Sequence, residues 1–127
     1  IGPRDLEEGQ CVLVRRDNRK KYFVKLDQLD TELPKIMEEY RQAIFQMAAD
    51  NRTAKTYTAT NMEEMAAHAD QGYIKAMWCG ALECEMKIKD DLGVTSRCIP
   101  FEQEQIGETC VCCQKPAKEM VMWGKAY

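Results

Sequence analysis

The chain has 127 residues, a formal net charge of −3 and a sequence pI near 5.3. A dedicated nucleic-acid binder usually has a clear basic excess, which this composition lacks, and no apolar run approaches the roughly 20 residues that span a bilayer. Seven cysteines without a recognisable signal peptide favour a reducing cytosol, with metal-ligating and free thiols rather than disulfides. Because the sequence begins at Ile1 without Met, we expect a piece of a longer polypeptide.

The first 28 residues predict a turn-rich lead-in over residues 1–5, followed by a hairpin. Residues 10–16 are β-branched and apolar and then basic, which favours a strand, and residues 21–25 supply its mate across a polar turn. The basic side chains here are candidates for contacts with RNA phosphates. The more ordinary interpretation is a solvent-exposed hairpin whose Lys and Arg side chains keep its edge strand from pairing with other chains. These side chains are Arg15, Arg16, Arg19, Lys20 and Lys21.

Residues 29–53 change to a helical period. Apolar side chains recur there at three- and four-residue steps, which predicts an amphipathic helix of five or six turns. They are Leu33, Ile36, Met37, Tyr40, Ile44, Met47 and Ala48. Pro34 is compatible with this helix if it lies in the first turn, where its missing N–H would have no partner. We interpret the segment as a helix that connects two domains.

Residues 54–127 predict a two-layer β-α-β-α-β-β domain of the α+β class, in which two helices cover one face of a four-stranded sheet. The expected strands are residues 56–59, 73–78, 94–99 and 119–125, and the expected helices are residues 60–71 and 81–91. Residues Thr60 to Glu63 match a capping box, and Gly72 suits a left-handed helix end.

Two further side chains in this domain have ordinary interpretations. His68, the only histidine, lies on the predicted polar helix, which favours a surface role over catalysis. Cys98 lies in the third strand and is expected to be a small buried apolar side chain.

Two close thiol pairs, separated by 25 residues, indicate a four-thiolate zinc site. Cys79 and Cys84 form the first pair, while Cys110 and Cys113 form the second with the spacing of a zinc knuckle. Cys112 is an alternative fourth ligand. Cys84 is expected in the first turn of a helix, where free N–H groups stabilise a thiolate. Four cysteine ligands leave zinc no open position, so the metal would be structural.

Four segments in order carry a family resemblance: residues 1–6, Cys79-Gly80-x-x-x-Cys84, residues 97–101 (Arg-Cys-Ile-Pro-Phe), and the run from Cys110 to Tyr127. Together they resemble the C-terminal end of prolyl-tRNA synthetases of the eukaryote- and archaea-like type, which is also found in some bacteria. That resemblance implies the end of an anticodon-binding domain (1–28), a connecting helix (29–53) and a C-terminal zinc-binding domain (54–127). The family often has Gly after the last cysteine, whereas Gln114 stands here, so the choice between Cys112 and Cys113 stays open.

The resemblance also implies a role for the chain end. In such synthetases the terminal tyrosine places its free carboxylate near the ATP and proline site of the catalytic domain, a role that falls on Tyr127. The parent enzyme, expected to be a homodimer, activates proline with ATP and transfers it to tRNA(Pro). Its catalytic motifs lie outside this sequence, so the piece alone is expected to be inactive. The alternatives are a zinc-stabilised module that binds RNA or protein by itself, and a thiol redox protein that uses residues 110–113.

Overall fold

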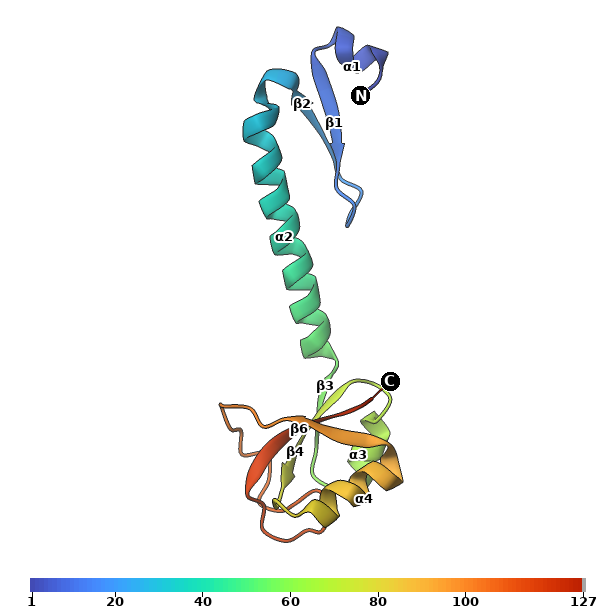
Figure 1. Ribbon diagram of the computed structural model, residues 1–127, viewed down its shortest axis with the longest axis vertical. Helices are drawn as coiled ribbons and strands as arrows, with labels where there is room; N and C mark the ends of the chain where they lie inside the picture. Colours follow the sequence, from blue (N-terminus) through green and yellow to red (C-terminus); the bar gives the residue numbers. More distant parts are fainter. Residues whose placement is uncertain (127) are drawn as a thin grey trace. The chain divides into compact units, whose positions relative to one another are not determined.

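The computed structural model describes residues 1–126. The chain divides into two compact units, residues 1–51 and residues 52–127, which are described separately below. Figure 1 shows the order of their elements. No helix in the described part of the chain is both long and apolar enough to cross a membrane.

The first unit begins with a short helix, α1 (Pro3–Glu7), where a turn-rich lead-in was predicted. Pro3 occupies the first helical position, where its fixed φ suits the helix. The carboxylate of Asp5 accepts a hydrogen bond from the backbone N–H of Gly2 at 2.7 Å. The prediction was wrong here because a helix of five residues is too short to show a period.

The predicted hairpin is present as β1 (Gln10–Val14) and β2 (Lys21–Lys25), which pair antiparallel. The first strand ends two residues earlier than expected, because the chain turns at Arg15, whose side chain forms a buried ion pair with Asp17. The Arg15 guanidinium donates to both carboxylate oxygens, at 3.0 and 2.6 Å. This ion pair lowers the pKa of Asp17 and keeps Arg15 charged.

A single 3-10 turn, η1 (Leu26–Gln28), leads into the long helix α2 (Leu29–Ala54). The predicted helix is therefore present, but Pro34 is its sixth residue and lies inside it rather than in the first turn. Ile36 is the buried residue of α2, and it packs with Cys11 of β1 and Val24 of β2 in a small core.

The second unit has the predicted element order. Its elements are β3 (Thr56–Ala59), α3 (Met62–His68), β4 (Tyr73–Trp78), α4 (Leu82–Leu92), β5 (Val94–Cys98) and β6 (Glu119–Lys125). The strands form one sheet in the order β3-β4-β6-β5. β3 and β4 are parallel, whereas β6 runs antiparallel to both of its neighbours, β4 and β5. The α+β fold expected from the sequence is therefore confirmed.

Both helices of the second unit pack on the same face of this sheet. The crossovers through α3 and α4 step in the same direction across the sheet, and right-handed crossovers of that kind place their helices on one side. Met65 of α3 and Ile88 of α4 share one fully buried core with Ile74 and Trp123 from the central strands. The remaining buried members of this core are Ala59, Ala69, Ala76, Val94, Val111 and Val121.

The ends of α3 differ from the prediction. Its N-cap is Asn61, whose side chain accepts from the backbone N–H of Glu64 at 2.9 Å, and the Glu64 carboxylate accepts from the backbone N–H of Thr60 at 2.7 Å. The capping interaction thus uses Asn61 and Glu64 rather than Thr60 and Glu63. The helix ends at His68, and the half-buried His68 ring stacks on Tyr57 with 4.1 Å between ring centroids.

Gly72 is needed because the backbone of Lys55 approaches it closely, and it does not end a helix in the left-handed conformation that the sequence predicted. A Cβ at this position would lie 2.1 Å from the carbonyl oxygen of Lys55, which accepts from the backbone N–H of Tyr73 at 2.9 Å. Gly93, by contrast, does end α4 in a left-handed conformation with φ of 66°.

Cys98 is exposed, contrary to the prediction of a buried side chain. The pairing of β5 with β6 shifts between Ser96 and Cys98, so that Cys98 lies opposite Met122. A bulge of this kind turns the following side chains to the other face of the sheet.

Candidate metal centre

The first thiol pair lies at the corner where β4 turns into α4. Cys79 directly follows β4, and Gly80 adopts a φ of 87°, which allows the tight turn into the helix. Cys84 is the third residue of α4 and is buried. The indole N–H of Trp78 donates to the carbonyl oxygen of Ala81 at 3.2 Å and so stabilises this corner.

The second thiol pair lies on a tight turn before β6. The backbone N–H of Cys110 donates to the carbonyl oxygen of Lys115 at 2.8 Å, and the N–H of Gln114 donates to the carbonyl oxygen of Cys110 at 3.0 Å. Two backbone bonds attach this turn to the end of β4. The N–H of Val111 donates to Met77 at 2.9 Å, and that of Lys118 donates to Trp78 at 2.7 Å.

The structure brings the sulfurs of Cys79, Cys84, Cys110 and Cys113 together, all within 4.8 Å of one another. The Sγ–Sγ distances are 3.7 Å from Cys79 to Cys84 and 3.8 Å from Cys79 to Cys113. A disulfide would need about 2.05 Å. Sulfurs bound to one zinc ion at about 2.3 Å in a tetrahedron lie about 3.8 Å apart. The measured distances therefore fit a tetrahedral metal site.

The burial of the first thiol pair favours a bound cation over free thiolates. Burial raises the pKa of the Cys79 and Cys84 thiols, because an isolated thiolate is poorly solvated there. The backbone N–H of Lys115 donates to the Cys113 sulfur and lowers the pKa of that thiol to about 7. A bound metal ion deprotonates coordinating thiols outright and would offset the charge of all four.

Cys112 is not a member of the four-sulfur group. Its side chain packs against the core of the second unit, and burial raises the pKa of its thiol. Cys113, the other candidate that the sequence left open, supplies the fourth sulfur of the group.

Gln114 follows Cys113, at the position where the resemblance implied a glycine. It adopts a left-handed φ of 58°, a conformation that glycine reaches at little cost. Its side chain forms contacts that glycine could not: Nε2 donates to the carbonyl oxygen of Thr60 at 3.2 Å, and Oε1 accepts from the hydroxyl of Thr109 at 3.1 Å. Sequence reasoning noted Gln114 only as a departure and did not identify this link to the β3–α3 connection.

The remaining candidates from the sequence are spread over the hairpin and the chain end. Arg15 is buried against Asp17, whereas Arg16, Arg19 and Lys20 are exposed. Arg16 donates to the Tyr40 hydroxyl at 3.2 Å, and the Lys20 ammonium lies 4.6 Å from the centre of the Tyr22 ring.

Tyr127 lies outside the described residues. The structure therefore describes the path of the chain as far as Ala126, beyond the end of β6.

The curated relatives of this chain are proline–tRNA ligases. Proline–tRNA ligase 2 of Bacillus cereus is 56% identical and covers the whole chain, which corresponds to 27% of the length of that protein. The proline–tRNA ligase of Clostridium novyi is 50% identical over the same share. The chain thus spans about a quarter of the length of the relatives it matches.

A solved structure agrees with these relatives. The prolyl-tRNA synthetase of Cryptosporidium parvum, crystallised with L-proline and AMP, matches the whole chain with a TM-score of 0.90 and 27% identity, over 28% of its own length. The family described as "Prolyl-tRNA synthetase, C-terminal" matches residues 62–127, a range that contains all four sulfurs of the cluster. This chain therefore belongs to the prolyl-tRNA synthetase C-terminal family.

Proposed function

We propose that this chain is the non-catalytic C-terminal portion of a proline–tRNA ligase of the eukaryote- and archaea-like type, which uses ATP to join proline to tRNA(Pro). Its relatives carry that name and are about four times as long, so the catalytic and remaining anticodon-binding parts would be supplied by the same polypeptide. We further expect a homodimer in the cytosol. The observation that carries the proposal is the match of the whole chain to about a quarter of these ligases, together with the match of residues 62–127 to their C-terminal family.

In this proposal the four sulfurs hold a structural zinc ion. Cys79 and Cys84 come from the β4–α4 corner, while Cys110 and Cys113 come from the turn before β6, so one ion would join segments that are far apart in the sequence. When bound, zinc supplies four strong bonds and a positive charge, and it has no position left for a substrate. Its effect would be on stability rather than on chemistry.

Zinc at this place would stabilise the start of the strand that leads to the chain end. β6 begins at Glu119, directly after the N–H of Lys118 has bonded to Trp78, and it runs between β4 and β5 until Lys125. Because it is paired with β4 and β5, β6 has a defined direction as far as Lys125. We propose that the carboxylate of Tyr127 then supports the proline and ATP site of the catalytic part.

The proposal is tested with the full-length polypeptide that carries this chain. We expect one zinc per chain by plasma mass spectrometry and proline-dependent exchange of pyrophosphate into ATP. Deletion of Tyr127 should lower that exchange strongly while the unfolding temperature stays unchanged. Proline-independent exchange would contradict the assigned activity, and an unaltered rate without Tyr127 would contradict the role of the chain end.

A further inference from the structure

The face of the sheet opposite α3 and α4 is only partly covered. Gln103, in the loop after β5, bonds to both backbone polar groups of Met120 in β6, at 2.6 Å to its N–H and 3.2 Å to its carbonyl oxygen, and so attaches this loop to the sheet. Met77 and Met120, whose side chains alternate onto this face near the cysteine cluster, are buried, so that half of the face is covered. Side chains at the other half are Thr56 and Thr58 of β3, Tyr73 and Lys75 of β4, and Met122 of β6.

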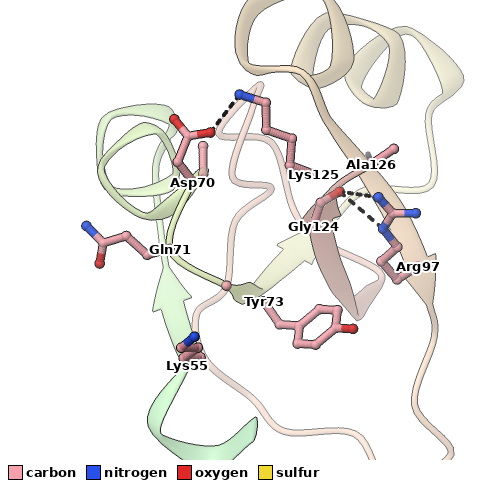
Figure 2. Close-up of a pocket in the computed structure, with 10 residues that line it drawn as sticks. Lys55, Asp70, Gln71, Tyr73, Arg97, Gly124, Lys125 and Ala126 are labelled. Carbon is pink, nitrogen blue, oxygen red and sulfur yellow. Dashed lines mark hydrogen bonds and ion pairs between the residues drawn. The ribbon is translucent and has the colours of Figure 1, made fainter. Parts of the chain in front are cut away.

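Two adjoining pockets, both lined by Tyr73 and Arg97, lie at the uncovered half and at the adjoining end of the sheet, where the α3–β4 connection borders the first of them. One has a volume of about 570 Å³ and is bordered by Lys55, Asp70 and Lys125 (Figure 2). The other has a volume of about 640 Å³ and adds Arg52 and Lys75. Hereafter this pair of pockets is called the basic face.

The basic face concentrates positive charge in an acidic chain. Five of the 18 cationic residues line it, against one of the 21 acidic residues. Lys125 pairs with Asp70 at 2.6 Å, and Lys75 pairs with Glu104. Among residues 1–126, no carboxylate lies within ion-pair distance of the other three cationic side chains, which are Arg52, Lys55 and Arg97.

An ordered aromatic and guanidinium pair lies at the centre of this face. Arg97 donates from Nε and Nη2 to the carbonyl oxygen of Gly124, at 3.2 and 2.9 Å, which fixes the plane of the guanidinium (Figure 2). A Cβ on Gly124 would lie 3.3 Å from the Tyr73 ring and 3.5 Å from Arg97 Nε, so the missing side chain lets both pack close to the strand. Tyr73 is 46% exposed.

We propose that the basic face binds the sugar–phosphate backbone of the RNA substrate, with Tyr73 available to stack on a base. Unpaired cations around an exposed aromatic ring on an open sheet suit RNA, because phosphates pair with the cations and bases stack on the ring. An acidic peptide would use the charges but would leave the ring without a partner of matching shape. RNA is therefore the occupant that the arrangement favours.

The position of the face along the chain supports the same occupant. Ala126 lines the first pocket, and it directly precedes Tyr127, whose carboxylate the proposed function assigns to the catalytic site. The acceptor strand of the RNA has to enter that site to receive proline. This inference rests on the proposed function and adds a surface for the RNA strand beside the chain end.

The test measures tRNA binding by the full-length polypeptide with fluorescence anisotropy over a range of salt concentrations. The Arg52→Gln/Lys55→Gln double variant should bind about tenfold more weakly in low salt, and the slope of log K against log salt should fall by about 0.7 for each phosphate that the variant no longer neutralises. The matched control is Lys87→Gln/Lys89→Gln, which removes the same charge from exposed side chains of α4, on the opposite face of the sheet. The control should bind like the parent.

Tyr73 provides a second readout that charge alone would not alter. Tyr73→Phe keeps the ring and should bind tRNA like the parent, whereas Tyr73→Ala should weaken binding about tenfold. Pyrophosphate exchange with proline needs no tRNA and should be unchanged in the Arg52→Gln/Lys55→Gln variant. Equal tRNA affinity in the Arg52→Gln/Lys55→Gln variant and its control would overturn the inference. A loss of proline activation without a loss of tRNA binding would also overturn it, and would identify an acidic protein surface as the occupant. A parent protein that does not activate proline would contradict the proposed function instead.

Discussion

The Nε2 group of Gln114 donates a hydrogen bond to the carbonyl oxygen of Thr60, 54 positions earlier in the chain, at 3.2 Å. It joins the turn that carries Cys110 and Cys113 to the connection between β3 and α3. The first thiol pair is attached to the same turn through Met77 and Trp78 of β4. The cysteine cluster is therefore held from two sides by hydrogen bonds of the protein itself.

Replacing Gln114 separates two contributions to the free energy of unfolding, namely the strain of its left-handed backbone conformation and the hydrogen bonds of its side chain. Gln114→Ala keeps the left-handed conformation, with φ of 58°, but removes the bonds to Thr60 and Thr109. Gln114→Gly removes the same bonds but relieves the conformational cost, which is about 1 kcal/mol. We expect the Ala variant to be the least stable of the three proteins in urea unfolding with zinc present. An Ala variant as stable as the Gly variant would contradict this assignment.

Removing one sulfur of the cluster should remove the metal. Cys84→Ser is expected to lower the zinc content well below one equivalent and to reduce the free energy of unfolding by several kcal/mol, because metal binding and folding are coupled in small sites. Cys98→Ser is the matched control, because Cys98 is exposed and outside the four-sulfur group. It should keep its zinc and change stability by less than about 0.5 kcal/mol. Full zinc content in Cys84→Ser would show that the ligand set is wrong.

Cys112 and Cys113 are adjacent, yet they should respond differently to substitution. The sulfur of Cys113 belongs to the cluster, whereas Cys112 packs against the core. Cys113→Ser should therefore release the zinc, and Cys112→Ser should retain it with a modest loss of packing. Zinc content and thiol alkylation under native conditions report both outcomes. The reverse pattern would mean that Cys112, and not Cys113, is the fourth metal ligand.

Gly72 should tolerate no side chain. In Gly72→Ala the new Cβ would meet the Lys55 carbonyl oxygen at 2.1 Å, and backbone on both sides would have to move. We expect a loss of about 2–3 kcal/mol in the free energy of unfolding. Gly107→Ala is the control, because nothing lies within 4 Å of a Cβ built there. Similar stabilities of the two variants in thermal unfolding would argue against the close approach seen in the structure.

The order of strands and helices in the second unit was predictable because the apolar periods are clear, although the ends of α3 were not. Residues 73–78 and 119–125 read as apolar strands, and both are strands over that full range. The cap of α3 was misplaced by one residue because Thr60 and Asn61 are both good caps, and each is followed three residues later by a glutamate, Glu63 and Glu64 respectively. Only the three-dimensional arrangement distinguishes the two.

The site was predictable in its thiol spacing but not in its supporting hydrogen bonds. Two cysteine pairs indicated four ligands, but the choice between Cys112 and Cys113 depends on the turn geometry, which adjacent sequence positions do not reveal. Cys98 was misjudged because a bulge in β5 reverses the alternation of faces that sequence counting assumes. The basic face could not be predicted from the sequence, because its cationic residues come from four separate segments of an acidic chain.

X-ray absorption at the zinc edge of the purified protein tests the central claim most directly, namely that four cysteine sulfurs hold one zinc ion. The account predicts four sulfur neighbours at about 2.3 Å and no lighter ligand. A spectrum that requires nitrogen or oxygen neighbours at about 2.0 Å, or protein that retains no zinc, would contradict it.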